Sequence, residues 1–109
     1  MDKCKVHGQI MWKKKIQYSI MIHKYLAEFV GTIFFVYIIL ATSNPLAIGA
    51  ALTVVLFLCS KISGGHVNPA VSVAMAAKGS LPTTDLIPYI VVQIVGGLVA
   101  LEIYKKWKL

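Results

Sequence analysis

The ten residues 63–72 read SGGHVNPAVS, and they separate two long apolar stretches of the chain. Two adjacent glycines permit backbone conformations that other residues avoid. Asn68 is a favourable N-cap residue, and Pro69 then falls at the first helical position, where its missing N–H has no partner to lose. Small apolar residues follow, and Gly79 is a typical helix stop. The pattern predicts a helix over 69–78, about 15 Å long, which is half of a ~30 Å hydrocarbon core.

A half-length helix between two apolar segments indicates a re-entrant element. Non-helical backbone at membrane depth is tolerated only where protein or a watery cavity satisfies its polar groups. We therefore expect an all-α transmembrane fold with three spanning helices and one re-entrant half-helix. The predicted spans cover about residues 25–41, 46–60 and 85–107, the half-helix covers 69–78, and a basic segment, 1–24, precedes them.

The composition supports a membrane protein. The chain of 109 residues is 58% hydrophobic, with 11 lysines, no arginine and four acidic residues. The lysines gather at the ends of apolar segments, which is a pattern of membrane topology and not of a nucleic-acid surface. Helices with so few polar positions also lack the solvated face of a soluble bundle. We expect the lipid bilayer as the environment and no nucleic-acid partner.

The residues offer little for catalysis. The two cysteines give no disulfide framework, and the three histidines lack metal-ligand spacing. No nucleophile–base pair or phosphate-binding loop can be assembled. We expect no enzyme activity, no cofactor and no metal. No ordinary cleavable signal peptide is visible, so the first membrane helix is expected to serve as its own signal.

The basic segment has two open interpretations. Residues 10–22 could form an interfacial amphipathic helix, or the segment could be a solvated tail beside anionic lipid. With the N-terminus inside, its six lysines join Lys61 and Lys78 on the cytoplasmic side, against three lysines on the far side. The positive-inside rule therefore favours a cytoplasmic N-terminus.

Polar residues inside the predicted spans mark positions of interest. Glu28 is the one acidic residue of the first span, and Thr32 shares its face. An intramembrane carboxyl group is by default functional or bracing, although Glu28 could instead lie at the interface. In the third span a polar and small face is predicted, consisting of Tyr89, Gln93, Gly96 or Gly97, and Ala100.

Two further packing details are predicted for the spans. In the second span, a largely small-residue stripe of Gly49, Thr53, Leu56 and Ser60 suits close helix packing. At the start of the third span, either Thr84 or Asp85 can serve as the N-cap.

Three stretches resemble signatures of the major intrinsic proteins, the aquaporins and glycerol facilitators. Residues 63–72 resemble the first Asn-Pro-Ala signature, residues 27–32 (AEFVGT) resemble the first-helix signature, and residues 89–93 (YIVVQ) resemble the third-helix Tyr-Ile-x-x-Gln pattern. The resemblance runs from about residue 25 to the C-terminus. It covers the first half of the family's inverted repeat. The second Asn-Pro-Ala, with the arginine that follows it in the family, is absent.

The resemblance implies roles for individual residues. In the family, two half-helices meet at the membrane midplane by their N-termini, and two asparagine amides donate to a passing water. The pore-lining and selectivity residues implied here are Asn68, Pro69, Ala70, Ile48 and, through backbone carbonyls, Gly64, Gly65 and His66. The residues implied to brace the re-entrant loop are Glu28, Thr32 and Gln93.

Some of these roles have open alternatives. Asn68 could be a helix cap without solute contact, and the His66 ring could pack instead of lining the path. Ile48 falls at the family's second-helix constriction, where it offers an apolar wall and no hydrogen bond, so water and glycerol both remain possible. The missing arginine removes a charge that helps to exclude cations and protons.

The resemblance implies a membrane channel component for passive transport of water or small neutral solutes such as glycerol. A second half would complete the pore, supplied by another copy in the opposite orientation or by a complementary chain. One alternative is a non-transporting truncated or modulatory membrane protein. A further alternative is a small proton-coupled exporter that uses Glu28.

Overall fold

A computed structural model describes residues 3–108 of the chain, with side chains from Gly8 onward. This part of the chain forms helices and no strands, which confirms the predicted all-α class. The helices are α1 (Lys3–Ala41), α2 (Pro45–Cys59), α3 (Pro69–Lys78) and α4 (Thr83–Lys106).

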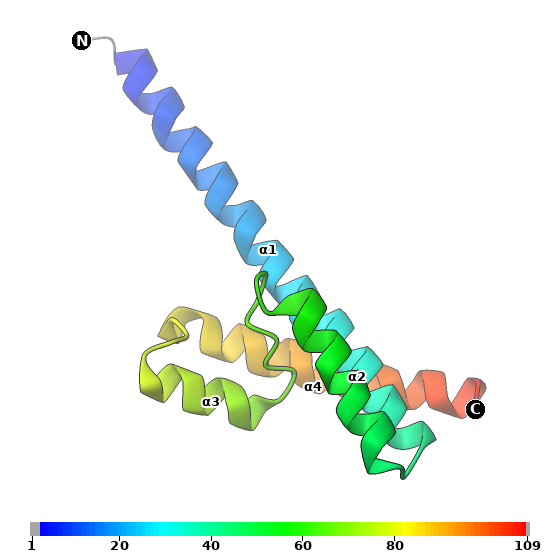
Figure 1. Ribbon diagram of the computed structural model, residues 1–109. Coiled ribbons are helices and arrows are strands. Elements are labelled where there is room, and N and C mark those ends of the chain that lie inside the picture. The colour runs from blue at the N-terminus through cyan, green and yellow to red at the C-terminus, as the bar shows by residue number, and fades with distance from the viewer. Residues whose placement is uncertain (1–2, 109) are drawn as a thin grey trace.

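Helix α1 is the centre of the arrangement. It packs against both α2 and α4, while α3 packs against α4 (Figure 1). The part of α1 that packs against other helices begins near Lys24. There the Lys24 ammonium lies 2.6 Å from the carboxylate of Asp85, at the start of α4. Near their other ends the Tyr37 hydroxyl donates to the Trp107 carbonyl at 2.6 Å. The two longest helices therefore run side by side in the same direction.

Small residues allow α1 and α4 to approach closely. A Cβ atom added to Gly96 would lie 3.0 Å from the backbone carbonyl oxygen of Phe29 and 3.2 Å from the Cβ of Thr32. Ala100, one turn further, is completely buried. Such small-residue contacts let helix backbones pack tightly. They lie on the face of α4 that the spacing of polar and small residues predicts.

Helix α2 packs with a different face from the predicted one. A Cβ added to Gly31 of α1 would meet Val55 at 3.3 Å and Cys59 at 3.6 Å, and Ala51 and Val55 are buried. The predicted stripe is not the face that packs on α1: Gly49, Thr53, Leu56 and Ser60 are all exposed, and Leu56 lies against the loop at Gly65. Both stripes have helical spacing. The stripe of Ala51, Val55 and Cys59 faces α1, because Gly31 has no side chain and leaves room for Val55 and Cys59.

The first helix begins much earlier than the predicted span. Residues 3–24 continue α1 without a break, so the helix is about 58 Å long. Side chains from Gly8 to Ile20 are exposed, because this part of α1 extends beyond the other helices (Figure 1). The division of the chain at residue 24, and the interfacial placement of residues 10–22, stay predictions.

Within the described part of the chain, two segments are long and apolar enough to cross a membrane, Gly8–Ala41 and Thr83–Lys106. Helix α2 is apolar but has 15 residues, about 22 Å, which is shorter than a ~30 Å hydrocarbon core. Its bounds differ by one residue at each end from the predicted 46–60. The number of spans therefore stays a prediction.

The ends of α3 agree with their prediction, whereas the start of α4 does not. Helix α3 covers residues 69–78, with Asn68 as its N-cap and Gly79 in the left-handed region, φ 92°. Helix α4 begins at Thr83 with Pro82 as its N-cap and no side-chain cap bond. The predicted cap by Thr84 or Asp85 is wrong, because the helix starts earlier and the Asp85 carboxylate binds residues of α1.

Candidate functional site

The α2–α3 loop, residues 60–68, has an unusual backbone. Gly64 and Gly65 have φ values of 95° and 65°, which glycine adopts readily. Val67 has φ 46° and is buried. For a β-branched residue the left-handed region is strained, and such strain persists only where the surroundings hold it. The contacts of this loop are therefore the first feature of the site.

The Glu28 carboxyl group of α1 holds the loop. Its Oε2 accepts hydrogen bonds from the Ser63 hydroxyl at 2.6 Å and the His66 backbone N–H at 3.0 Å. Its Oε1 accepts from the Val67 backbone N–H at 2.8 Å and from Nε2 of Gln93 at 2.8 Å. Glu28 is fully buried. A buried carboxyl group with four donors satisfies loop amides that would otherwise be unpaired at considerable cost in free energy.

Helix α4 also contributes contacts to the site. Gln93 Nε2 also lies 2.9 Å from the Ser72 hydroxyl of α3, and that hydroxyl is 2.9 Å from Nδ1 of His66. The His66 ring lies beside the Tyr89 ring, with 5.4 Å between centroids. The Tyr89 hydroxyl donates to the Ser63 carbonyl at 2.7 Å. Side chains of α1, α3 and α4 thus converge on a single loop.

The N-terminus of α3 is the exposed part of the site. Asn68 Oδ1 accepts from the Ala70 backbone N–H at 2.9 Å, and Pro69 occupies the first helical position. Asn68 and Ala70 are exposed, while Pro69 is half-buried. The cap uses the side-chain oxygen, which leaves the Nδ2 amide as the donor of Asn68. Partial positive charge at a helix N-terminus adds to this donor. The arrangement leaves a hydrogen-bond donor beside the start of the helix, where the partial positive charge favours an oxygen acceptor.

The remaining predicted residues lie in distinct surroundings. Gly64 is exposed and Gly65 is buried against Leu56. Ile48 is half-exposed on α2. Thr32 is buried against Gly96, and its hydroxyl has no hydrogen-bond partner among the described residues. The pore-lining roles, and the bracing role assigned to Thr32, remain predictions.

The sequence patterns missed several side chains of this network. Ser63 and Ser72 are the first and last residues of the stretch 63–72, but the sequence patterns predict a role for neither. Asp85 is predicted only as one of two possible helix caps, although Asp85, Tyr89 and Gln93 follow one another at steps of four residues. Extending that face of α4 backwards by one turn would have identified it. No pattern in α1 alone pairs Lys24 or Tyr25 with Asp85.

The geometry defines a class of protein. Apolar helices long enough to cross a membrane carry a buried carboxyl group, and this group holds a strained loop that opens a half-length helix. Such an arrangement is typical of channel-forming membrane proteins, in which irregular backbone lines a path.

The family follows from the comparison with known proteins. The model of the major intrinsic proteins matches residues 15–109, and the chain belongs to this family of membrane channels. It is therefore an integral membrane protein.

Individual relatives agree with this assignment. The chain is 43% identical over 86 residues to Glycerol uptake facilitator protein-like 6 of Lactiplantibacillus plantarum, with 71% of this chain and 40% of the relative covered. It is 39% identical over 98 residues to Aquaporin Z of Brucella melitensis, with 76% and 43% covered. It is 33% identical over 95 residues to Aquaporin Z of Photorhabdus laumondii, with 73% and 41% covered. The chain thus spans about two fifths of the length of these relatives.

Proposed function

We propose that this chain supplies one side of a membrane pore for passive transport of water or small neutral solutes such as glycerol. The carrying observation is the N-terminus of α3, where Asn68 is an exposed residue whose side-chain oxygen caps the helix, so that Nδ2 is its side-chain donor. Carbonyls of Gly64, Gly65 and His66 would accept hydrogen bonds from the solute along the path. Ile48 would contribute an apolar wall without a hydrogen bond, so the constriction would admit both water and glycerol.

The proposed topology has three spans and the half-helix α3, with the N-terminus in the cytoplasm. The lysine distribution supports this orientation. A second half, from another copy or a complementary chain, would face Asn68 and complete the pore. The exposed stripe of α2 supports such a partner, since Thr53, Leu56 and Ser60 line an open groove of about 630 Å³.

The surroundings of Glu28 do not favour a proton-coupled exporter. A carboxyl group that cycles its proton needs an accessible acceptor site, whereas Glu28 is fully buried and receives four donors. A modulatory, non-transporting role is the second candidate, and the crosslinking below tests it. The channel component is therefore the function that the geometry supports best.

Osmotic shrinkage of membrane vesicles that contain the protein tests this proposal. We expect faster shrinkage than in vesicles without it, and a glycerol gradient followed by re-swelling will separate water from glycerol passage. Asn68→Asp keeps an oxygen acceptor for the Ala70 N–H but removes the Nδ2 donor. We expect it to reduce the protein-dependent rate by about tenfold, the value of one hydrogen bond.

Asn44→Asp is the matched control, because Asn44 caps α2 in the same way. It should leave the rate unchanged. Shrinkage at the background rate with well-inserted protein would refute the channel proposal. Crosslinking in the native membrane then identifies the partner as a second copy, a full-length channel or another chain.

A further inference from the structure

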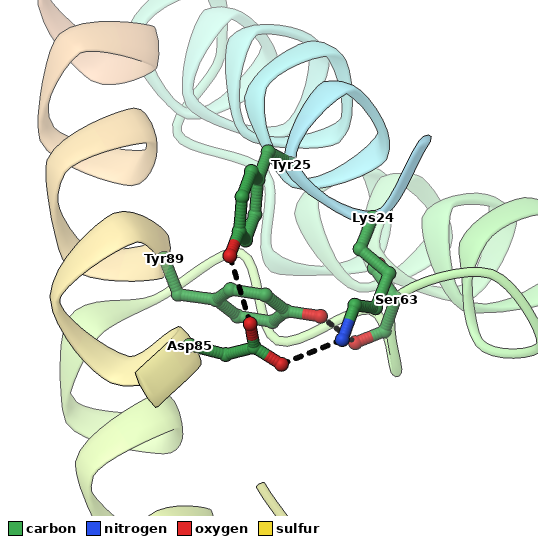
Figure 2. A network of polar contacts seen from close by, with 5 residues as sticks. All are labelled: Lys24, Tyr25, Ser63, Asp85 and Tyr89. Carbon is green, nitrogen blue, oxygen red and sulfur yellow. Dashed lines mark hydrogen bonds and ion pairs between the residues drawn. The ribbon is translucent and has the colours of Figure 1, made fainter. Parts of the chain in front are cut away.

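A largely buried polar cluster joins α1, at Lys24 and Tyr25, to Asp85 in the first turn of α4. The Asp85 carboxylate accepts from the Lys24 ammonium at 2.6 Å and from the Tyr25 hydroxyl at 2.8 Å. The two donors are neighbours on α1, and they bind different oxygens of the carboxylate. Figure 2 shows all three side chains converging beside Tyr89 and the carbonyl of Ser63. We call Lys24, Tyr25 and Asp85 the entry cluster.

The entry cluster is an energetically sensitive feature because it is largely removed from solvent. The Asp85 side chain is 5% exposed and the Lys24 side chain is 22% exposed. Removing one partner of a buried ion pair leaves an uncompensated charge, which destabilises more than removing both. The other ion pair of the described chain, Lys105 with Glu102, has side chains 59% and 70% exposed, and its charges are 3.4 Å apart. Exposed pairs of that kind contribute little.

Contacts run from the entry cluster to the α2–α3 loop. The Tyr25 ring meets the Tyr89 ring edge to face, with 6.0 Å between centroids. The Tyr89 hydroxyl holds the Ser63 carbonyl, while the Ser63 hydroxyl binds Glu28. Ser63 is thereby fixed at two atoms, immediately before the glycine pair. The contacts of Tyr89 with the Tyr25 ring and with the Ser63 carbonyl therefore connect the entry cluster to one of these two attachments.

We propose that Lys24, Tyr25 and Asp85 form a positioning cluster that holds the α2–α3 loop in place through Tyr89. None of the three is proposed to contact solute. The effect on the loop is independent of transport, whereas the effect on permeation rests on the proposed function. The cluster would make the solute path dependent on an ion pair between the first and last helices.

Hydrogen–deuterium exchange of the full chain in lipid nanodiscs tests the positioning directly. The monitored amides are those of residues 63–67, whose acceptors lie on Cys59, Ser60, Ser63 and Glu28. We expect Lys24→Gln to accelerate their exchange by at least about tenfold, since a hydrogen bond between charged groups is lost and Asp85 stays buried without its cation. Helix α2 amides should change much less, because among the described residues no hydrogen bond or ion pair joins α2 to the cluster.

A double substitution separates this mechanism from general damage. Adding Asp85→Asn to Lys24→Gln removes the unpaired charge and keeps an oxygen acceptor for the Tyr25 hydroxyl. We expect the loop amides of the double variant to exchange more slowly than those of Lys24→Gln alone. If the effects of the two substitutions on amide exchange add instead, or if the amides of all helices exchange faster to the same degree, the positioning role of the entry cluster is refuted. Lys105→Gln is the control for the exposed pair and should leave exchange unchanged.

Permeation gives the second measurement. Vesicle shrinkage should fall with Lys24→Gln and recover in part in the double variant. Unchanged shrinkage with faster loop exchange would refute the link from cluster to path. If wild-type vesicles show no protein-dependent shrinkage, the channel proposal fails, and the exchange measurement still decides whether the cluster positions the loop.

Discussion

Two helices of this protein begin with Asn-Pro, and only one of them forms part of the candidate site. Asn44 and Asn68 each accept a hydrogen bond at 2.9 Å from the backbone N–H two residues later, and each is followed by proline at the first helical position. The local chemistry is the same. As helix caps, the two asparagines are equivalent.

Their surroundings differ completely. The Asn44 backbone N–H bonds to the Thr42 hydroxyl within an exposed turn. Asn68 follows Val67, whose backbone is in the left-handed region and bonds to the buried Glu28. The comparison teaches that an Asn-Pro cap becomes a candidate solute contact only where distant helices hold the chain in front of it.

Glu28→Ala should produce the largest change. It removes the acceptor of four hydrogen bonds, two of them from loop backbone amides, and leaves a cavity. At about 1–3 kcal/mol for each buried unpaired group, the free energy of unfolding should fall by more than about 4 kcal/mol. Denaturant unfolding in detergent measures this loss. Glu102→Ala, at an exposed carboxylate, should change it very little.

Local exchange refines this prediction. The amides around Asn68 should lose protection in Glu28→Ala, while those that follow Asn44 keep theirs. Equal loss at both helix starts would contradict the distinction between the two caps.

Two glycine substitutions should change the free energy of unfolding in opposite directions. Gly65→Ala places a Cβ 3.0 Å from a Leu56 methyl group at φ 65°, so we expect a loss of about 2 kcal/mol. Gly49→Ala, four residues after Pro45, meets nothing within 4 Å in a helix interior. It should increase the free energy of unfolding by about 0.5–1 kcal/mol. A stabilising effect of Gly65→Ala would show that the loop backbone is not restrained as described.

The caps themselves are expected to have small effects on stability, similar in size to that of Gly49→Ala. Asn44→Ala and Asn68→Ala each remove one cap bond and should each cost about 1 kcal/mol of unfolding free energy. Circular dichroism with denaturant measures both. Only Asn68→Ala should also slow vesicle shrinkage. An equal effect of Asn44→Ala on shrinkage would remove the functional difference between the two helix starts.

Much of the local structure could be predicted from residue types. Asn68, Pro69 and Gly79 delimit α3 because caps and stops are determined by neighbouring backbone groups. The small face of α4, with Gly96 and Ala100, was predictable because helical spacing places those residues together. The candidate pore residues came from resemblance, and their roles stay predictions.

Partner selection could not be predicted in the same way. Aspartate is a common residue type at helix N-caps, yet Asp85 pairs with Lys24, 61 residues away in the chain. The stripe of Gly49 and Thr53 has the spacing of a packing face, yet Gly31 selects Val55 and Cys59. Each case involves two locally acceptable choices, and a residue on another helix decides between them.

From its residues alone, this chain is an apolar, lysine-flanked helical protein with a short helix opened by Asn-Pro. Those properties depend on interactions within a few residues and on transfer from water to an apolar phase. The tertiary structure determined which asparagine follows a strained loop, which carboxyl group holds that loop and which pairs with a lysine. Long-range hydrogen bonds and ion pairs depend on where whole helices lie, and the spacing of residues along one helix does not determine those positions.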